Sequence, residues 1–133
     1  MLKCIVNKVV ITDEEIDNLR NLVSQLNTKK DSVIVVEGKK DSQALKSLGV
    51  SAKILEFYRF GGIIKFTDAM TRYKNIILFF DRDRKGKYLT RKTIQLLQRR
   101  TKIDLSYKRK LWSITKGKIM FIEQLSIYEH YIN

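Results

Sequence analysis

Two short apolar runs, residues 33–36 and 76–80, constrain the fold more than any other feature of this sequence. Neither run alternates with polar residues, so each predicts a strand that is buried on both faces. Segments with helical spacing follow them, which predicts βαβ units with right-handed crossovers. The expected fold class is therefore α/β, a sandwich with a central, mostly parallel four-stranded sheet, helices on both faces and an additional N-terminal helix.

The expected elements divide the chain into one domain with three parts. The core, residues 32–107, has predicted strands at 32–36, 52–57, 75–80 and 103–107, and predicted helices at 41–48, 63–73 and 87–100. The extension, residues 1–31, has a strand at 4–11 and a helix that ends near residue 27. Thr12 and Glu15 have the spacing of a capping box at the start of that helix. Residues 108–133 are expected to form a basic segment and a closing helix at 121–131.

The positive charge of the chain is concentrated in one stretch. The sequence has 27 Lys and Arg against 14 Asp and Glu, a net charge of +13, and residues 82–118 hold 14 of the basic residues with only two acids. A polyanion is the partner that such a stretch favours, because bound Lys and Arg displace condensed counterions from phosphates. A solvated lysine-rich surface is the alternative.

A membrane protein or a secreted disulfide-rich protein is not expected. The longest apolar run, residues 76–80, is far shorter than the ~20 residues of a membrane span. The first residues lack the apolar core of a signal peptide. Cys4 is the only cysteine, which excludes an internal disulfide and fits a reducing compartment. We therefore expect a cytoplasmic protein.

Acidic residues follow both buried runs. Glu37 comes directly after the first run, and Asp81 and Asp83 follow the second. The carboxyl ends of parallel strands meet at one edge of a sheet, so these carboxylates are expected to converge there. A divalent cation would relieve their repulsion, and Mg²⁺ prefers oxygen ligands. Gly38 would allow close approach of the backbone, and Gly86 would free the turn into the next helix. Ordinary surface acids paired with lysines are the alternative.

These residues resemble the Toprim domain of bacterial-type primases, type IA and type II topoisomerases, overcoming-lysogenization-type nucleases and the 5S ribosomal RNA maturation nuclease. The resemblance lies in residues 35–41, VVEGKKD, and residues 80–86, FDRDRKG, and extends over residues 32–107. Length and flanking segments are most similar to the stand-alone small primase-like Toprim proteins of archaea. The resemblance implies that Glu37 is a metal ligand or general acid/base, that Asp81 and Asp83 bind Mg²⁺, with Mn²⁺ as the alternative ion, and that Asp41 is a supporting group.

One position departs from this family. Many members have glutamate directly after the second glycine, where this chain has Lys87. The number of metal ions therefore stays open, and Lys87 favours contact with phosphate.

Basic residues around the acids are the candidates for binding nucleic acid. They are Lys39, Arg59, Arg82, Arg84, Lys85, Lys87, Arg91, Lys92, Arg99 and Arg100. A surface role is an equal alternative for Arg59. Tyr107 and Trp112 flank a basic tripeptide and could stack on unpaired bases, although packing in the core is the stronger expectation for Trp112.

Two classes of function fit these features. The first is an Mg²⁺-dependent enzyme that acts on nucleic-acid phosphodiesters as a monomer or weak homodimer. Cleavage is favoured over primase-like nucleotidyl transfer, since synthesis usually requires further domains, and RNA is preferred over DNA only through the resemblance. The second is a non-catalytic RNA- or DNA-binding module of a ribonucleoprotein, in which the basic stretch carries the function.

Overall fold

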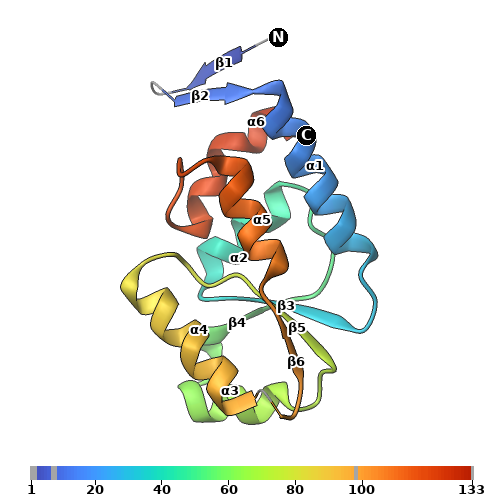
Figure 1. Cartoon of the computed structure of the whole chain (residues 1–133), viewed down its shortest axis with the longest axis vertical. Coiled ribbons are helices and arrows are strands. Elements are labelled where there is room, and N and C mark those ends of the chain that lie inside the picture. The colour runs from blue at the N-terminus through green and yellow to red at the C-terminus, as the bar shows by residue number, and fades with distance from the viewer. Residues whose placement is uncertain (1–2, 7–8, 98, 133) are drawn as a thin grey trace.

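A four-stranded parallel sheet forms the centre of the fold, as the sequence predicts (Figure 1). Its strands are β3 (Ser32–Val36), β4 (Ile54–Glu56), β5 (Asn75–Leu78) and β6 (Lys102–Asp104). They lie in the order β4-β3-β5-β6, and each neighbouring pair is parallel. The two strands that carry the apolar runs are thus the central pair. The computed structural model describes residues 3–6, 9–97 and 99–132, with side chains from residue 10 onward.

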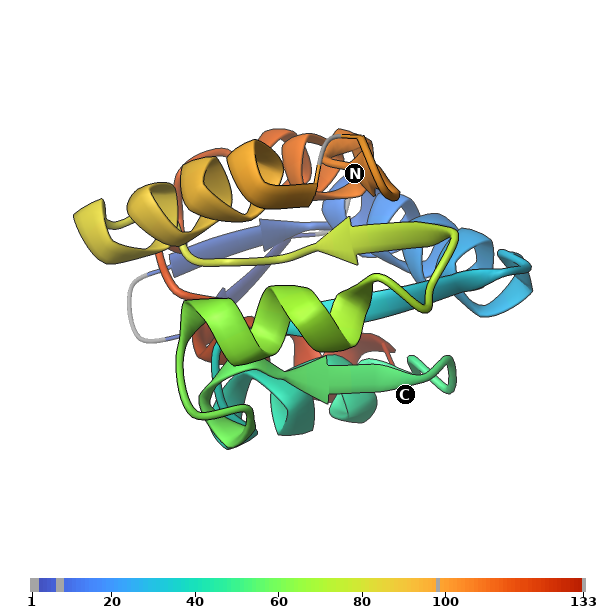
Figure 2. The same cartoon turned by 90° about the horizontal axis from the view of Figure 1, so that it is seen from below.

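Helices cover both faces of this sheet, which confirms the α/β sandwich. One face carries α3 (Ile63–Met70) and α4 (Arg84–Leu97), and the other carries α1 (Asp13–Thr28), α2 (Lys39–Ser47) and α5 (Ser106–Thr115). Figure 2 views the molecule from below, the side on which α3 and α4 lie. Along β3, Val33 and Val35 pack under α3 and α4, while Ile34 and Val36 pack against the opposite layer. Both faces of the strand are buried, which explains its continuous apolar run.

Several elements have other bounds than predicted. The strand expected at 75–80 ends at Leu78, although Phe79 and Phe80 stay buried beyond it. The strand expected at 52–57 is limited to β4, and the helix expected to reach residue 73 ends at Met70. The helix expected at 87–100 is α4, which begins at Arg84 and ends at Leu97. The apolar run at 76–80 therefore indicates which residues are buried, and not how far the strand pairs.

The helix α5 was not predicted. The strand expected at 103–107 stops at Asp104, whose carboxylate accepts hydrogen bonds from Ser106 N at 2.8 Å and Ser106 Oγ at 2.6 Å. This turn starts α5, in which Tyr107, Leu111 and Thr115 are buried at four-residue spacing. Those three residues form the apolar stripe of an amphipathic helix, hidden in the sequence by the lysines and arginines between them.

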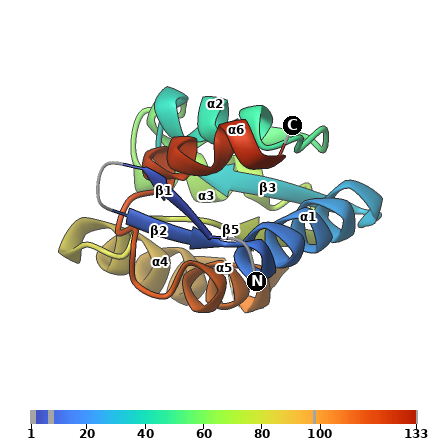
Figure 3. The same ribbon diagram turned by 90° about the horizontal axis from the view of Figure 1, so that it is seen from above.

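The single strand predicted at residues 4–11 is a hairpin of two antiparallel strands, β1 (Lys3–Val6) and β2 (Val9–Thr12). In the sequence, the polar pair at positions 7 and 8 interrupts the apolar run, and this pair lies outside the described residues. Among the described residues the hairpin pairs only with itself, and it lies apart from the central sheet (Figure 1). Figure 3 shows β2 leading directly into α1.

The closing helix predicted at 121–131 is a 3₁₀-helix, η2 (Ile122–Tyr128), followed by the short helix α6 (Glu129–Ile132). Its buried residues are Ile122, Leu125 and Tyr128, which repeat every three positions. A 3₁₀-helix has three residues per turn, so this spacing places all three side chains on one face.

Glu15 has a different partner from the one that a capping box requires. Thr12 Oγ1 accepts a hydrogen bond from Glu15 N at 3.2 Å, as predicted. The Glu15 carboxylate, however, is buried, pairs with the Lys118 ammonium group and accepts a hydrogen bond from Tyr128 Oη at 2.9 Å. Glu15 therefore joins the first turn of α1 to the C-terminal segment, more than 100 residues away in the sequence.

No helix within the described ranges is long and apolar enough to cross a membrane.

We expect Glu15→Ala to lower the free energy of unfolding by about 2–3 kcal/mol, because the substitution leaves Lys118 and the Tyr128 hydroxyl without their shared partner. Urea denaturation measures this change. Glu14→Ala is the matched control, since Glu14 is exposed in the same turn of α1 and feels the same helix dipole. Equal losses in the two variants would show that the buried network adds no stability.

Candidate functional site

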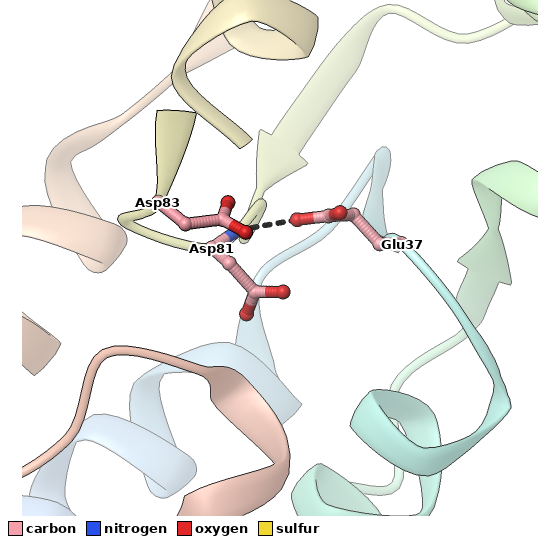
Figure 4. A group of neighbouring side chains, drawn as sticks. All are labelled: Glu37, Asp81 and Asp83. Atoms are coloured by element: carbon pink, nitrogen blue, oxygen red, sulfur yellow. Dashed lines mark hydrogen bonds between the residues drawn. The ribbon is translucent and has the colours of Figure 1, made fainter. Parts of the chain in front are cut away.

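Three carboxylates meet at the carboxyl edge of β3 and β5 (Figure 4). Glu37 directly follows β3, and Asp81 and Asp83 follow the neighbouring strand β5. Asp81 N donates a hydrogen bond of 2.7 Å to Glu37 Oε2, although the two residues are 44 positions apart. One carboxylate oxygen of each residue lies within 4.8 Å of the others. The structure thus brings together the three residues that the sequence singled out.

A backbone amide orients each of these carboxylates. Glu37 accepts from Asp81 N, Asp81 Oδ1 accepts from Ile122 N at 2.7 Å, and Asp83 Oδ1 accepts from Gly86 N at 2.8 Å. One oxygen of each group therefore has a backbone partner, which orients the carboxylate. The second oxygens of Asp81 and Asp83 are candidate ligands, and so is Glu37 Oε1, which also accepts a hydrogen bond of 3.4 Å from Tyr58 Oη.

Burial makes the cluster electrostatically costly. Glu37 and Asp81 are only 5% and 8% exposed. Burial, together with the carboxylates of Glu37 and Asp41, raises the pKa of Asp81 to about 8, against the opposing hydrogen bond from Ile122 N–H. Burial, followed by the charge of Glu37, also raises the pKa of Asp41. Neutralisation by a proton or a cation therefore relieves the cluster.

The three carboxylates fit a divalent cation. An all-oxygen ligand set is the type that Mg²⁺ selects, and it commonly uses only a few carboxylates together with water. Two oxygens that share one Mg²⁺ lie at most ~4.2 Å apart, so small side-chain rotations bring the observed oxygens within reach. Glu37, Asp81 and Asp83 are the residues that could hold such an ion.

Gly86 is required because a side chain would not fit at this position, and not because a turn needs its backbone freedom. It lies in the first turn of α4, which begins at Arg84 and not at the predicted residue 87. A Cβ atom at this position would lie 2.0 Å from the Asp81 carbonyl oxygen. Only glycine therefore allows the loop between Asp81 and Asp83 to fold back tightly onto α4.

Gly38 and Asp41 support the site from α2. Gly38 is the N-cap residue of this helix, and its N–H donates a hydrogen bond of 3.1 Å to Asp41 Oδ2. The Tyr58 ring would lie 3.3 Å from a Cβ atom at Gly38. The glycine therefore lets Tyr58 approach the backbone beside Glu37.

Five of the predicted basic residues lie beside the acids. Lys39 and Lys85 line a shallow pocket of about 370 Å³ together with the three carboxylates and Tyr58. A second pocket of about 920 Å³ adjoins the first and shares Asp83 and Lys85 with it. Its other lining residues are Arg84, Lys87, Tyr88 and Arg91.

Other predicted basic residues lie elsewhere. The Arg82 guanidinium lies 5.5 Å from the Trp112 ring centroid on α5, and Arg59 pairs with Glu56 at 3.3 Å. Lys92 is half-buried on α4. Arg99 and Arg100 follow the C-terminal end of α4, whose 14 residues span ~21 Å from the acidic end. The structure thus divides the basic stretch between a part at the acids and a part remote from them.

Comparison with known proteins places the chain in a family. No family model matches the sequence. A UPF0292 protein from Thermococcus sibiricus is 34% identical over 113 residues, which cover 84% of this chain and 88% of the relative. A UPF0292 protein from Archaeoglobus fulgidus is 31% identical over 109 residues, covering 80% and 85%. The chain belongs to the UPF0292 family.

The fold is shared with a solved structure of a protein from Aquifex aeolicus. The TM-score is 0.59 at 24% identity, and the match covers 86% of this chain and 97% of the other. This likeness supports the α/β architecture alone.

Lys108 is a site residue that the sequence did not indicate. It lies on α5, and its Nζ donates a hydrogen bond of 3.2 Å to Thr90 Oγ1 on α4. Burial lowers the pKa of Lys108, while the carboxylates of Glu37 and Asp81 oppose this shift. Lys108 belongs to the predicted basic segment, where no helix was predicted before residue 121, so no local pattern placed it near the acids.

Two tyrosines near the acids were also missed. Tyr107, the expected stacking residue, is buried, and Trp112 is half-buried against the core. Tyr58 and Tyr88 are instead the exposed rings beside the acids, and Tyr58 Oη donates a hydrogen bond of 3.4 Å to Glu37 Oε1. For Tyr88 the only sequence signal was its position two residues after Gly86, and for Tyr58 there was no local signal.

We expect Asp81→Asn to flatten the pH dependence of stability in metal-free protein. A pKa raised to about 8 means that the folded protein keeps a proton that the unfolded chain loses near the ordinary aspartate pKa of 3.8. This contribution to the free energy of unfolding is therefore complete below that value and is lost as the pH rises toward 8. Denaturation in EDTA across this range measures the slope.

Asp68→Asn is the control, because Asp68 is exposed on α3. Its slope should match that of the unsubstituted protein. A slope in Asp81→Asn as steep as in the unsubstituted protein would contradict the assignment.

Proposed function

We propose that this protein is a divalent-cation-dependent enzyme that cleaves phosphodiester bonds in nucleic acid. The observation that carries the proposal is the convergence of Glu37, Asp81 and Asp83 at one sheet edge, beside a pocket lined by basic residues. The acids supply oxygen ligands for a metal ion, and the adjoining Lys and Arg side chains attract phosphate.

The Toprim resemblance of the sequence supports the same proposal. It suggests Mg²⁺ as the cation, with Mn²⁺ as the alternative, and it favours RNA over DNA through the ribosomal RNA maturation nuclease. The proposed location is the cytoplasm, in keeping with a single cysteine. We further propose that the protein acts as a monomer or weak homodimer.

The proposed reaction is hydrolysis. Water oxygen forms a bond to phosphorus, one phosphorus–oxygen bond of the strand breaks, and the products are a phosphomonoester and a hydroxyl group. A bound cation would polarise the phosphate and stabilise the developing charge. Glu37, held by Asp81 N–H, is placed to accept a proton from the attacking water. Lys85 and Arg84 are placed to hold the strand, since both line the adjoining pocket.

We expect Glu37→Gln and Asp81→Asn each to reduce Mg²⁺-dependent cleavage by about a hundredfold or more, because each substitution removes a negatively charged ligand oxygen. Both variants keep an oxygen that can accept the backbone hydrogen bond. Cleavage of labelled structured RNA and single-stranded DNA, with Mg²⁺, Mn²⁺ or EDTA, measures the effect.

Asp68→Asn again serves as the control and should cleave like the unsubstituted protein. Cleavage that survives in Glu37→Gln and Asp81→Asn would show that the site is wrongly assigned. Strand extension in the presence of nucleoside triphosphates would instead identify primase-like nucleotidyl transfer at the same acids.

A second candidate function is a non-catalytic RNA- or DNA-binding module of a ribonucleoprotein. The remote position of Arg99 and Arg100 favours it, because charge that far from the acids can bind a polyanion but cannot contact the reacting phosphate. Lys87, where many Toprim members have an acid, points the same way. This function requires tight binding that survives loss of all three carboxylates.

For either function, we expect the salt dependence of binding to weaken when four basic residues of the 82–118 stretch are replaced by glutamine. The four are Arg91, Lys92, Arg99 and Arg100. If all four contact phosphates, the slope of log K against log salt concentration should fall by about 3 for a single strand. Fluorescence anisotropy at several salt concentrations measures the slope.

The matched control makes the same charge change elsewhere on the surface. It replaces four exposed basic residues of α2, α3 and the segment after α3, namely Lys46, Lys65, Arg72 and Lys74. An equal fall in slope for both variants would mean that the 82–118 stretch is not the contact surface.

A further inference from the structure

The exposed face of α4 carries one aromatic ring among cations. Arg84, Lys87, Tyr88 and Arg91 have i, i+3, i+4 and i+7 spacing, which places them on one side of the helix. The opposite side of α4 is buried through Gly86, Leu89, Thr93 and Leu97. All four residues of the exposed face line the pocket of about 920 Å³ that reaches Asp83.

Tyr88 has the exposure and surroundings of a stacking platform. Tyr88 is 44% exposed, and the Arg91 guanidinium lies 5.8 Å from its ring centroid. A neutral ring between cations offers a flat apolar surface to a base and charges to the adjacent phosphates. Tyr58, at 51% exposure, repeats this pairing at the acidic pocket, where Lys85 Nζ lies 4.6 Å from its ring centroid.

We propose that the first two turns of α4 bind an unpaired nucleotide of a single strand, with its base stacked on Tyr88 and its phosphates held by Arg84, Lys87 and Arg91. This inference rests on the proposed function and names its substrate as an unpaired strand. The pocket at Tyr88 shares Asp83 and Lys85 with the acidic pocket. A strand that continues past Lys85 therefore brings a neighbouring phosphate to the carboxylates, near Tyr58.

A duplex does not satisfy this face. Paired bases are stacked on one another inside the duplex, so their faces cannot reach Tyr88, and only the phosphates contact the cations. Tyr88 thus contributes to the binding of a single strand and not to the binding of a duplex. Arg84, Lys87 and Arg91 contribute to both.

The test is binding of short fluorescent strands in EDTA, where no cleavage is expected. Single strands of RNA and of DNA are compared with a blunt duplex of each. We expect Tyr88→Leu to weaken single-strand binding about tenfold, since stacking on an aromatic ring accounts for roughly that factor per base. Tyr88→Phe should restore binding to within about twofold, because it keeps the ring. Neither substitution should change duplex binding.

Leu96→Ala is the matched control, because Leu96 is 40% exposed on the same helix and does not line the pocket. It should leave single-strand binding unchanged. Melting temperatures of all variants exclude misfolding as the cause of any loss.

Three results would overturn the inference. They are unchanged single-strand binding in Tyr88→Leu, an equal loss on the duplex, and failure of the unsubstituted protein to bind single strands. Because binding is measured without a metal ion, this outcome is independent of cleavage. Selective loss in Tyr88→Leu without any Mg²⁺-dependent cleavage would refute the proposed enzyme and keep the subsite. Mg²⁺-dependent cleavage with a KM that Tyr88→Leu leaves unchanged would keep the proposed enzyme and refute the subsite.

Discussion

The parallel pairing of β3 with β5 is the constraint on which the rest of the structure depends. Both strands are buried on two faces, so an edge position for either would expose apolar surface that no helix covers. The pairing aligns Val35 with Leu78, and parallel strands leave the sheet at the same edge. Glu37 follows one strand at once and Asp81 follows the other after two more buried residues. The hydrophobic core therefore places the acids, and the helices around the sheet set their surroundings.

The acids in turn hold the fold together. Glu37 closes the gap between the two strand ends by accepting Asp81 N–H, and Asp81 links this edge to η2 by accepting Ile122 N–H. Hydrogen bonds from the backbone offset part of the cost of burying these carboxylates. The cluster cannot relax outward without breaking contacts between β3, β5 and the C-terminal segment. Its geometry is accordingly built into the main chain.

The sequence was informative where one local pattern decides the structure. Apolar runs at 33–36 and 76–80 sufficed for the sheet, and acids after them sufficed for the cluster. The sequence was uninformative where contacts between residues far apart in the chain decide the structure. Tyr107 was assigned to a strand because the Asp104 turn was not recognised, and α5 was missed with it. Lys108 and Tyr58 reach the acids only through contacts between segments distant in the sequence, which no spacing along the chain reports.

Charge also suggests an order of binding under the proposed function. Three carboxylates repel a phosphate, and exposed charges act only within about a Debye length, ~8–10 Å at moderate salt. The cations of α4 that face the same pocket lie within this range, so they attract a strand that the carboxylates alone would repel. Their attraction reaches the phosphate beside Asp83 only after the negative charge of the cluster is reduced. A divalent cation reduces it by two units, so occupation of the acidic cluster by a cation should precede docking of the reacting phosphate at the acids, whereas binding of the strand at Tyr88 requires no metal ion.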